Sequence, residues 1–60
     1  MNAIKSVQLM ELGYDAEQIE TILALTESEI AEHCYEFWYE LTNDEELAEL
    51  KTNQTLEIMF

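Results

Sequence analysis

The sequence predicts an all-α fold: a compact three-helix bundle with a short fourth helix and an extended or packed C-terminal tail. Three observations support this prediction. The chain has no proline and one glycine, so little in it interrupts a helix. Its apolar residues recur three or four positions apart, which is the spacing of one helix face. An aspartate and a threonine precede two of these apolar runs, where helix-capping residues belong.

The first helix is expected over residues 2–12. Gly13 follows it, and glycine enters the left-handed region of backbone space without a steric penalty, so Gly13 should end this helix. The apolar residues at helical spacing are Ala3, Ile4, Val7 and Met10.

Two capping signals mark the second and third helices. Asp15 begins the second helix, with Gln18 in the position of a capping-box partner. Thr26 and Glu29 form a second capping box at the start of the third helix. The second helix presents Ile19, Ile22 and Leu23 as its apolar positions. The third helix should bury Ile30, Cys34, Phe37 and Leu41, with Trp38 at the edge of that face.

Asn43 is expected to cap a short fourth helix that ends at Leu50. The acidic residues after Asn43 suit the positive N-terminal end of a helix. In the last six residues, TLEIMF, apolar and other side chains alternate, which is typical of an extended strand or a packed arm.

Sixty residues suffice for one small domain, expected over residues 1–60, with a marginal core. Cys34 is the only cysteine, which indicates a reducing compartment and a buried thiol rather than a disulfide framework. No apolar run has the length of a membrane span, and the N-terminus lacks the pattern of a signal peptide. We expect a cytoplasmic protein, in the host cell's cytoplasm if the chain is phage-encoded.

The charge is the dominant feature of the composition. Fourteen acidic residues face two lysines, for a net charge of -12. Disorder is one interpretation of such a balance, but 48% of the chain is hydrophobic and its apolar residues are periodic. Nucleic acid and anionic membranes are poor partners for such a surface, whereas a basic protein surface or a bound cation is a good one.

Four glutamates of the third helix fall on one flank of a helical wheel, away from the apolar face. We call Glu29, Glu32, Glu36 and Glu40 the acidic ridge. A solvated helix face usually mixes lysine with glutamate, and this flank has no lysine. The glutamate spacing also resembles every second phosphate of a nucleic-acid strand, at about 3.4 Å per phosphate. The alternative is that the ridge is only a solvated face.

Tyr35 and Tyr39, the tyrosine pair, fall between Trp38 and the acidic ridge, where aromatic side chains typically anchor an interface. The alternative is that the fourth helix or the tail covers them. A second acidic patch comprises Asp44, Glu45, Glu46 and Glu49.

Residues 13–33, GYDAEQIETILALTESEIAEH, resemble the helix-turn-helix of LuxR-type regulators and of the terminal domain of bacterial sigma factors. The resemblance rests on the glycine, the cap, the Leu-Thr turn and the spacing of Ile30 and His33, and it covers about a third of the chain. It implies a helix-turn-helix scaffold. It does not extend to DNA binding, because the recognition helix carries glutamates where the family has Lys and Arg.

A second resemblance involves LMELGYDAEQI, residues 9–19, which looks like the first loop of ubiquitin-associated domains. Leu12, Gly13 and Tyr14 would form that loop, with Leu12 where the family usually has methionine. This resemblance implies a ubiquitin-binding patch on a bundle of similar size.

Catalytic and metal-binding chemistry is not expected. His33 with Glu29 or Glu36 supplies two ligands, whereas a structural zinc site needs four. Cys34 points about 100° away from His33 around the helix, which is poor geometry for an activated thiol. We therefore expect no enzyme, no catalytic residue, no metal and no cofactor.

The sequence thus favours a non-enzymatic inhibitor that occupies a basic, nucleic-acid-binding site on a partner protein. By type it looks like the small acidic anti-defence or polymerase-directed proteins of phages, some of which mimic DNA. The expected partner-binding residues are the acidic ridge, the tyrosine pair and the second acidic patch. A transcription-regulatory module that binds polymerase or a regulator, and a ubiquitin-associated-like module, are the alternatives. A homodimer through Trp38, Tyr39 and the tail is compatible with all three.

Overall fold

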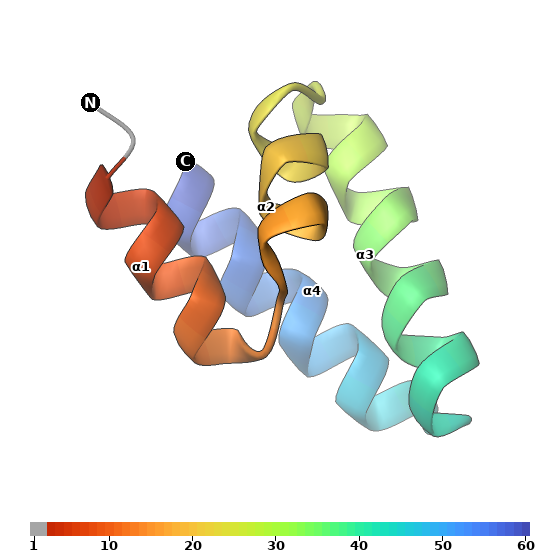
Figure 1. Cartoon of the computed structure of the whole chain (residues 1–60). Coiled ribbons are helices and arrows are strands. Elements are labelled where there is room, and N and C mark those ends of the chain that lie inside the picture. Colours follow the sequence, from red (N-terminus) through yellow and green to blue (C-terminus); the bar gives the residue numbers. More distant parts are fainter. Residues whose placement is uncertain (1–2) are drawn as a thin grey trace.

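The structure is a computed structural model that describes residues 3–60, and every regular element in that range is an α-helix. The all-α prediction is confirmed (Figure 1). The expected first residue of the first helix, Asn2, lies outside the described residues. The helices are α1 (Ala3–Leu12), α2 (Ala16–Leu23), α3 (Glu27–Thr42) and α4 (Glu45–Met59).

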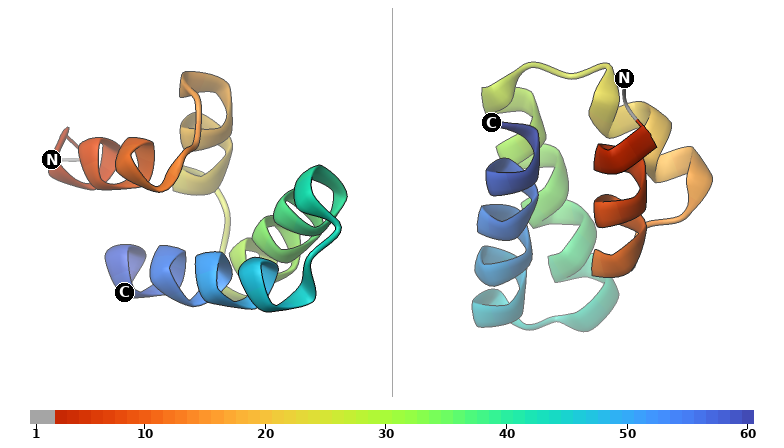
Figure 2. Two further views of the ribbon diagram at one scale, coloured as in Figure 1. Left: turned by 90° about the horizontal axis from the view of Figure 1, so that it is seen from below. Right: turned by 90° about the vertical axis from the view of Figure 1, so that its left-hand side faces the viewer.

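Helix α4 holds the arrangement together. It runs antiparallel to both α3 and α1 (Figures 1 and 2). Its packing against α3 is the most extensive in the molecule, and it also packs against α1. The short helix α2 connects α1 to α3 and packs against α1. The chain therefore folds back on itself so that its last helix contacts both its first and its third.

The end of α1 is a hydrogen-bonded Schellman motif. The Gly13 amide donates to the Met10 carbonyl at 3.0 Å, and the Tyr14 amide donates to the Leu9 carbonyl at 3.4 Å. Gly13 has a φ of 117°, in the region that favours glycine, so its predicted role as a helix terminator is confirmed. The motif turns the chain so that Tyr14, only 2% exposed, enters the core.

Both predicted caps are present. The Asp15 side chain accepts from the Gln18 amide at the start of α2. Thr26 and Glu29 form the complete capping box at the start of α3. These caps satisfy amides that have no partner inside their own helix.

The prediction for the link between α3 and α4 is wrong in one residue. Asn43 does not cap α4; it ends α3 in the left-handed conformation, with φ at 56°. Asp44 is the N-cap of α4, and its side chain accepts from the Leu47 amide at 3.1 Å. Asparagine tolerates the left-handed region well, so adjacent C-cap and N-cap residues join the helices without a longer loop.

The prediction of a short fourth helix ending at Leu50, followed by an extended strand or packed arm, is also wrong. Helix α4 continues to Met59. Its buried face is made of small or polar residues, Ala48, Thr52 and Thr55, at spacings of four and three. The Thr52 and Thr55 hydroxyls donate to the carbonyls of Ala48 and Lys51, one turn earlier, so they are buried with their hydrogen bonds satisfied.

The core lies where all four helices meet. The buried face of α3 is Ile30, Cys34 and Trp38, whereas Leu41, predicted to be buried, is 65% exposed. The Trp38 ring lies over Gly13, where a missing side chain leaves room for it. The contact between Trp38 and Gly13 rotates α3 so that Trp38 faces the core and Leu41 faces solvent. The predicted core residue Phe37 is half-buried. The buried apolar residues are Leu9, Tyr14, Ile19, Ile22, Ile30, Cys34, Trp38 and Ala48.

A chain of hydrogen bonds crosses this core. The Trp38 indole donates to the Tyr14 hydroxyl at 2.8 Å, which lies 2.8 Å from the Thr55 hydroxyl. Because Thr55 gives its one hydrogen to the Lys51 carbonyl, Tyr14 is the donor to Thr55. The chain Trp38–Tyr14–Thr55 therefore joins α3, the α1–α2 link and α4 with every polar group satisfied.

We expect Gly13→Ala to lower the free energy of unfolding by about 1–3 kcal/mol, measured by urea denaturation. An added Cβ would lie 2.9 Å from Trp38 Cη2, on a backbone with a φ of 117°. The matched control is Asn43→Gly, which introduces glycine at the other positive-φ position and should change stability by less than about 0.5 kcal/mol. An unchanged Gly13→Ala variant would contradict this account of the turn.

Tyr14→Phe should lower the free energy of unfolding at neutral pH by about 1–3 kcal/mol, because it leaves the buried Trp38 N–H without an acceptor. Burial raises the pKa of Tyr14 above its ordinary value of 10.0. Above pH 10 the unfolded chain therefore loses this proton first, and stability falls as the pH rises.

The Tyr14→Phe variant should accordingly lose part of that alkaline slope, by up to about 1.4 kcal/mol per pH unit. Tyr39→Phe is the matched control, since it removes the same atom from a half-buried ring. Denaturation curves between neutral and alkaline pH that show equal slopes for the wild type and Tyr14→Phe would exclude the proposed linkage.

Candidate functional site

Both lysines of the chain are used inside the fold. Lys51 donates to the Leu12 carbonyl at 2.8 Å, at the end of α1, and its ammonium lies 5.1 Å from the centre of the Trp38 ring. Lys5 donates to the Met59 carbonyl, at the end of α4, at 3.4 Å. Carbonyls at the end of a helix lack intrahelical partners and attract cations. The outer flank of α3 is therefore left without a lysine.

The acidic ridge lies on that outer flank, and all four of its glutamates are exposed. Glu29 differs from the others because its carboxylate accepts from the Thr26 amide at 2.9 Å and from the Thr26 hydroxyl at 3.0 Å. These hydrogen bonds lower the pKa of Glu29. Glu29 thus has a structural role in the cap, and Glu32, Glu36 and Glu40 make up the rest of the ridge.

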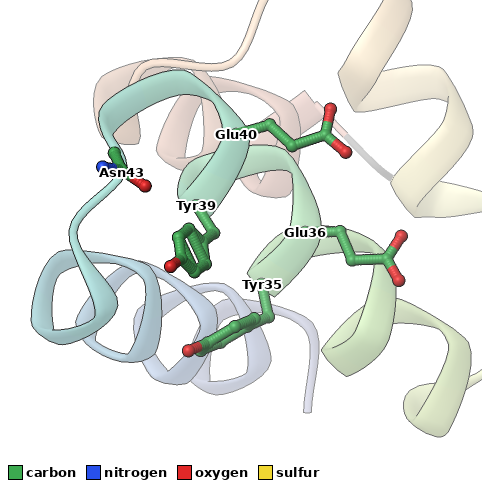
Figure 3. Close-up of a pocket in the computed structure, with 5 residues that line it drawn as sticks. All are labelled: Tyr35, Glu36, Tyr39, Glu40 and Asn43. Atoms are coloured by element: carbon green, nitrogen blue, oxygen red, sulfur yellow. The ribbon is translucent and has the colours of Figure 1, made fainter.

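The ridge stands between shallow hollows. An open hollow of about 560 Å³ on one side is lined by the tyrosine pair, Glu36, Glu40 and Asn43 (Figure 3). Two smaller hollows, of about 250 and 190 Å³, lie on the side of His33. Glu36 lines all three hollows, so it is the central residue of the ridge. The carboxylates are therefore carried on a convex surface rather than inside a pocket.

The tyrosine pair is half-buried, so it is partly covered by the fold and partly available to a partner. The two rings pack edge to face, with centroids 6.0 Å apart and an interplanar angle of 80°. In Figure 3 the rings extend toward α4, whereas the carboxylates of Glu36 and Glu40 extend to the other side of α3. The tyrosine rings and the carboxylates therefore point to different sides of α3, although all four residues line the hollow of about 560 Å³.

Two members of the second acidic patch, Glu45 and Glu49, are near enough to Tyr35 for their charges to act on it. Desolvation raises the pKa of Tyr35, and the charges of Glu45 and Glu49 raise it further. Glu45 and Glu49 are one turn apart on α4. Glu46 points about 100° away from Glu45 around the helix, and Asp44 is held as the N-cap. The structure therefore joins Glu45 and Glu49 to the ridge by way of Tyr35, and leaves Asp44 and Glu46 outside this arrangement.

The structure gives His33 and Cys34 structural roles. His33 Nε2 lies 2.9 Å from the Gln18 amide oxygen, which can only accept, so the imidazole donates and links α3 to α2. Cys34 is fully buried, and burial raises the pKa of its thiol. Within residues 3–60, no group of three or more His, Cys, Asp or Glu side chains is placed to hold a metal ion.

Other features of the site were not visible in the sequence pattern. Asn43 lines the hollow beside the tyrosine pair, although the sequence suggested only a capping role for it. Tyr14, part of the loop that resembles ubiquitin-associated domains, is buried, so its side chain is not available to a partner in this fold. Trp38 is 6% exposed, so it offers little surface to the possible homodimer through Trp38, Tyr39 and the tail. Over the described part of the chain, no helix has the length and apolar character needed to cross a membrane.

In comparisons with known proteins, no family model matches the chain, and neither the curated proteins nor the solved structures give a significant match.

The proximity of Tyr35 to Glu45 and Glu49 has a measurable consequence. Glu45→Gln combined with Glu49→Gln should lower the pKa of Tyr35, because two negative charges that disfavour the phenolate are removed. The pKa is read from the assigned ring resonances of Tyr35 in an NMR titration. The control variant, Glu20→Gln, removes one negative charge from α2 and should leave the pKa of Tyr35 unchanged. Equal pKa values in the wild type and the double variant would show that the two patches are separate.

Proposed function

We propose that this protein is a non-enzymatic inhibitor whose acidic surface occupies a basic, nucleic-acid-binding site on another protein. The contact surface comprises Glu32, Glu36 and Glu40 of the ridge, the tyrosine pair, and Glu45 and Glu49 of α4. In this proposal the chain acts as a small mimic of nucleic acid, of the kind that phages use against host defence or host polymerase.

The single observation that carries the proposal is the absence of any lysine from the ridge. A helix face that is only solvated usually alternates cations with anions, because such pairs stabilise the helix. Here both lysines are bonded to carbonyls at the ends of α1 and α4. The repulsion among Glu32, Glu36 and Glu40 is thus not relieved within the chain, and a cationic partner would relieve it.

The shape of the surface supports the same partner. A convex line of carboxylates fits a concave basic groove, which is the form of many sites that hold a nucleic-acid strand. The tyrosine pair adds apolar area beside the carboxylates, and partly exposed tyrosines are frequent interface anchors. Arginine is the expected contact of this combination, since it pairs with carboxylates and stacks on aromatic rings.

We expect Glu32→Lys combined with Glu36→Lys to weaken binding to a captured nucleic-acid-binding protein by at least about tenfold, since attraction becomes repulsion at the centre of the ridge. The experiment is a pull-down with mass spectrometry at rising salt, followed by titration of the purified partner. Duplex DNA or RNA should displace the wild-type chain, because both would occupy one site.

The matched control is Glu20→Lys combined with Glu57→Lys, which makes the same change in net charge at exposed positions on α2 and α4. This control should lose less than about threefold in affinity, because charges outside the contact act only at long range and are screened by salt. The proposal fails if both double variants bind equally, or if no nucleic-acid-binding protein is captured at low salt. Capture of polymerase that nucleic acid does not displace would instead favour a transcription-regulatory role.

A further inference from the structure

The outer face of α1 carries a row of large apolar side chains that the fold does not cover. Ile4 is 73% exposed, Val7 is 55% exposed and Met10 is 59% exposed. We call these three residues the α1 row. The sequence pattern predicted them as the apolar face of this helix, but α1 instead buries Leu9 and turns Lys5 toward the end of α4. The row thus lies on the opposite side of α1 from its contact with α4.

The charge around this row differs from that of the rest of the molecule. Helix α1 contains one lysine, Lys5, and one acidic residue, Glu11, so its side-chain charges balance. The other thirteen of the fourteen acidic residues lie at positions 15–57, with Lys51 as the only lysine among them. The α1 row is therefore an exposed apolar surface on a helix whose side-chain charges sum to zero.

We propose that the α1 row is the contact of a symmetric homodimer, in which two copies pack their α1 helices antiparallel. This dimer is separate from the acidic ridge and does not depend on the proposed function. It differs from the homodimer that the sequence allowed through Trp38, Tyr39 and the tail, because its contact lies on the first helix.

The row is self-complementary. Its residues stand three positions apart on either side of Val7, so a twofold axis at Val7 places Ile4 of one copy against Met10 of the other and sets the two Val7 side chains together. A twofold interface requires such a self-complementary patch. The exposed Ala3 beside the row is small, which lets the two helices approach closely.

Charge repulsion selects this face for a second copy. Two chains of net charge -12 repel each other, and a contact through α3 or the start of α4 would set glutamates against glutamates. A contact through α1 holds the acidic ridges apart. A basic partner, by contrast, gains nothing from a balanced helix and is attracted to the ridge.

The size of the face indicates a weak dimer. A standard interface buries about 800 Å² on each partner, which would be a large share of the 4111 Å² that this chain exposes. The α1 row lies on a ten-residue helix that is only about 15 Å long, so its contact should be smaller than a standard interface. Interfaces smaller than the standard size are typical of weak association. The dimer should therefore form as the protein concentration rises.

The test is sedimentation equilibrium of the full chain over a range of concentrations at about 0.1 M and about 1 M salt, where the screening length falls from about 10 Å to about 3 Å. The wild type should move from a mass of 7.0 kDa toward twice that value. Association should strengthen at high salt, because screening reduces the repulsion between the copies while the apolar contact persists. Capture of a basic partner weakens with salt, so the two interactions give opposite signatures.

Val7→Lys should raise the dimer dissociation constant by at least about tenfold, because it places two like charges together at the axis. It also reduces the net negative charge of the chain by one, so a loss of association cannot come from greater general repulsion. Leu41→Lys is the matched control: Leu41 is an exposed apolar residue on α3, and the same change there should leave the dimer at least as stable as in the wild type.

Circular dichroism is the check that each variant is folded, and both should be, because both positions are exposed. A wild type that stays monomeric at the highest concentration in high salt overturns the dimer. So does association that weakens with salt, or an equal loss in Val7→Lys and Leu41→Lys. Failure of the dimer leaves the capture experiment on the ridge unaffected, since Val7→Lys should bind a basic partner as the wild type does.

Discussion

The hydrogen-bonded chain from Trp38 through Tyr14 to Thr55 is the interaction on which the rest of the structure depends. It joins three parts of a 60-residue chain at one point, where the apolar core alone is small. Each hydroxyl in the chain both accepts and donates, so burial leaves no polar group without a partner. Because the Trp38 ring lies over Gly13, the same contact fixes the rotation of α3 about its axis. That rotation places the acidic ridge on the outside of the molecule.

The two lysines connect stability with surface charge. Each ammonium binds the carbonyl end of a helix that is distant in sequence, so each lysine closes a long segment of the chain. A surface lysine paired with a glutamate would contribute little to stability, since exposed ion pairs are weak. Using both cations as helix caps thus serves the fold without neutralising the flank of α3. The same two lysine–carbonyl contacts therefore stabilise the bundle and leave the outer flank of α3 with negative charges alone.

Local capping chemistry was predictable from the sequence because it depends on few residues and short spacings. Gly13, Asp15 and the pair Thr26–Glu29 occupy the places that their residue types predict. The length of α4 was not predictable in this way, because its buried face consists of Ala48 and two threonines, which do not register as an apolar stripe. The choice between Trp38 and Leu41 depended on a long-range contact with Gly13. The helical wheel predicted that the ridge is exposed. It could not predict that Glu45 and Glu49 lie near Tyr35, because that depends on how α3 packs against α4.

The placement of the lysines also bears on how the chain would be degraded. Trypsin cleaves after lysine and arginine, and here both candidate bonds lie within helices, one in α1 and one in α4. A protease needs an extended segment, so cleavage at Lys5 or Lys51 requires α1 or α4 to open first. The rate of digestion would then report the opening of the bundle itself. Once both bonds are cut, residues 6–51 leave as a single fragment that retains every residue of the ridge.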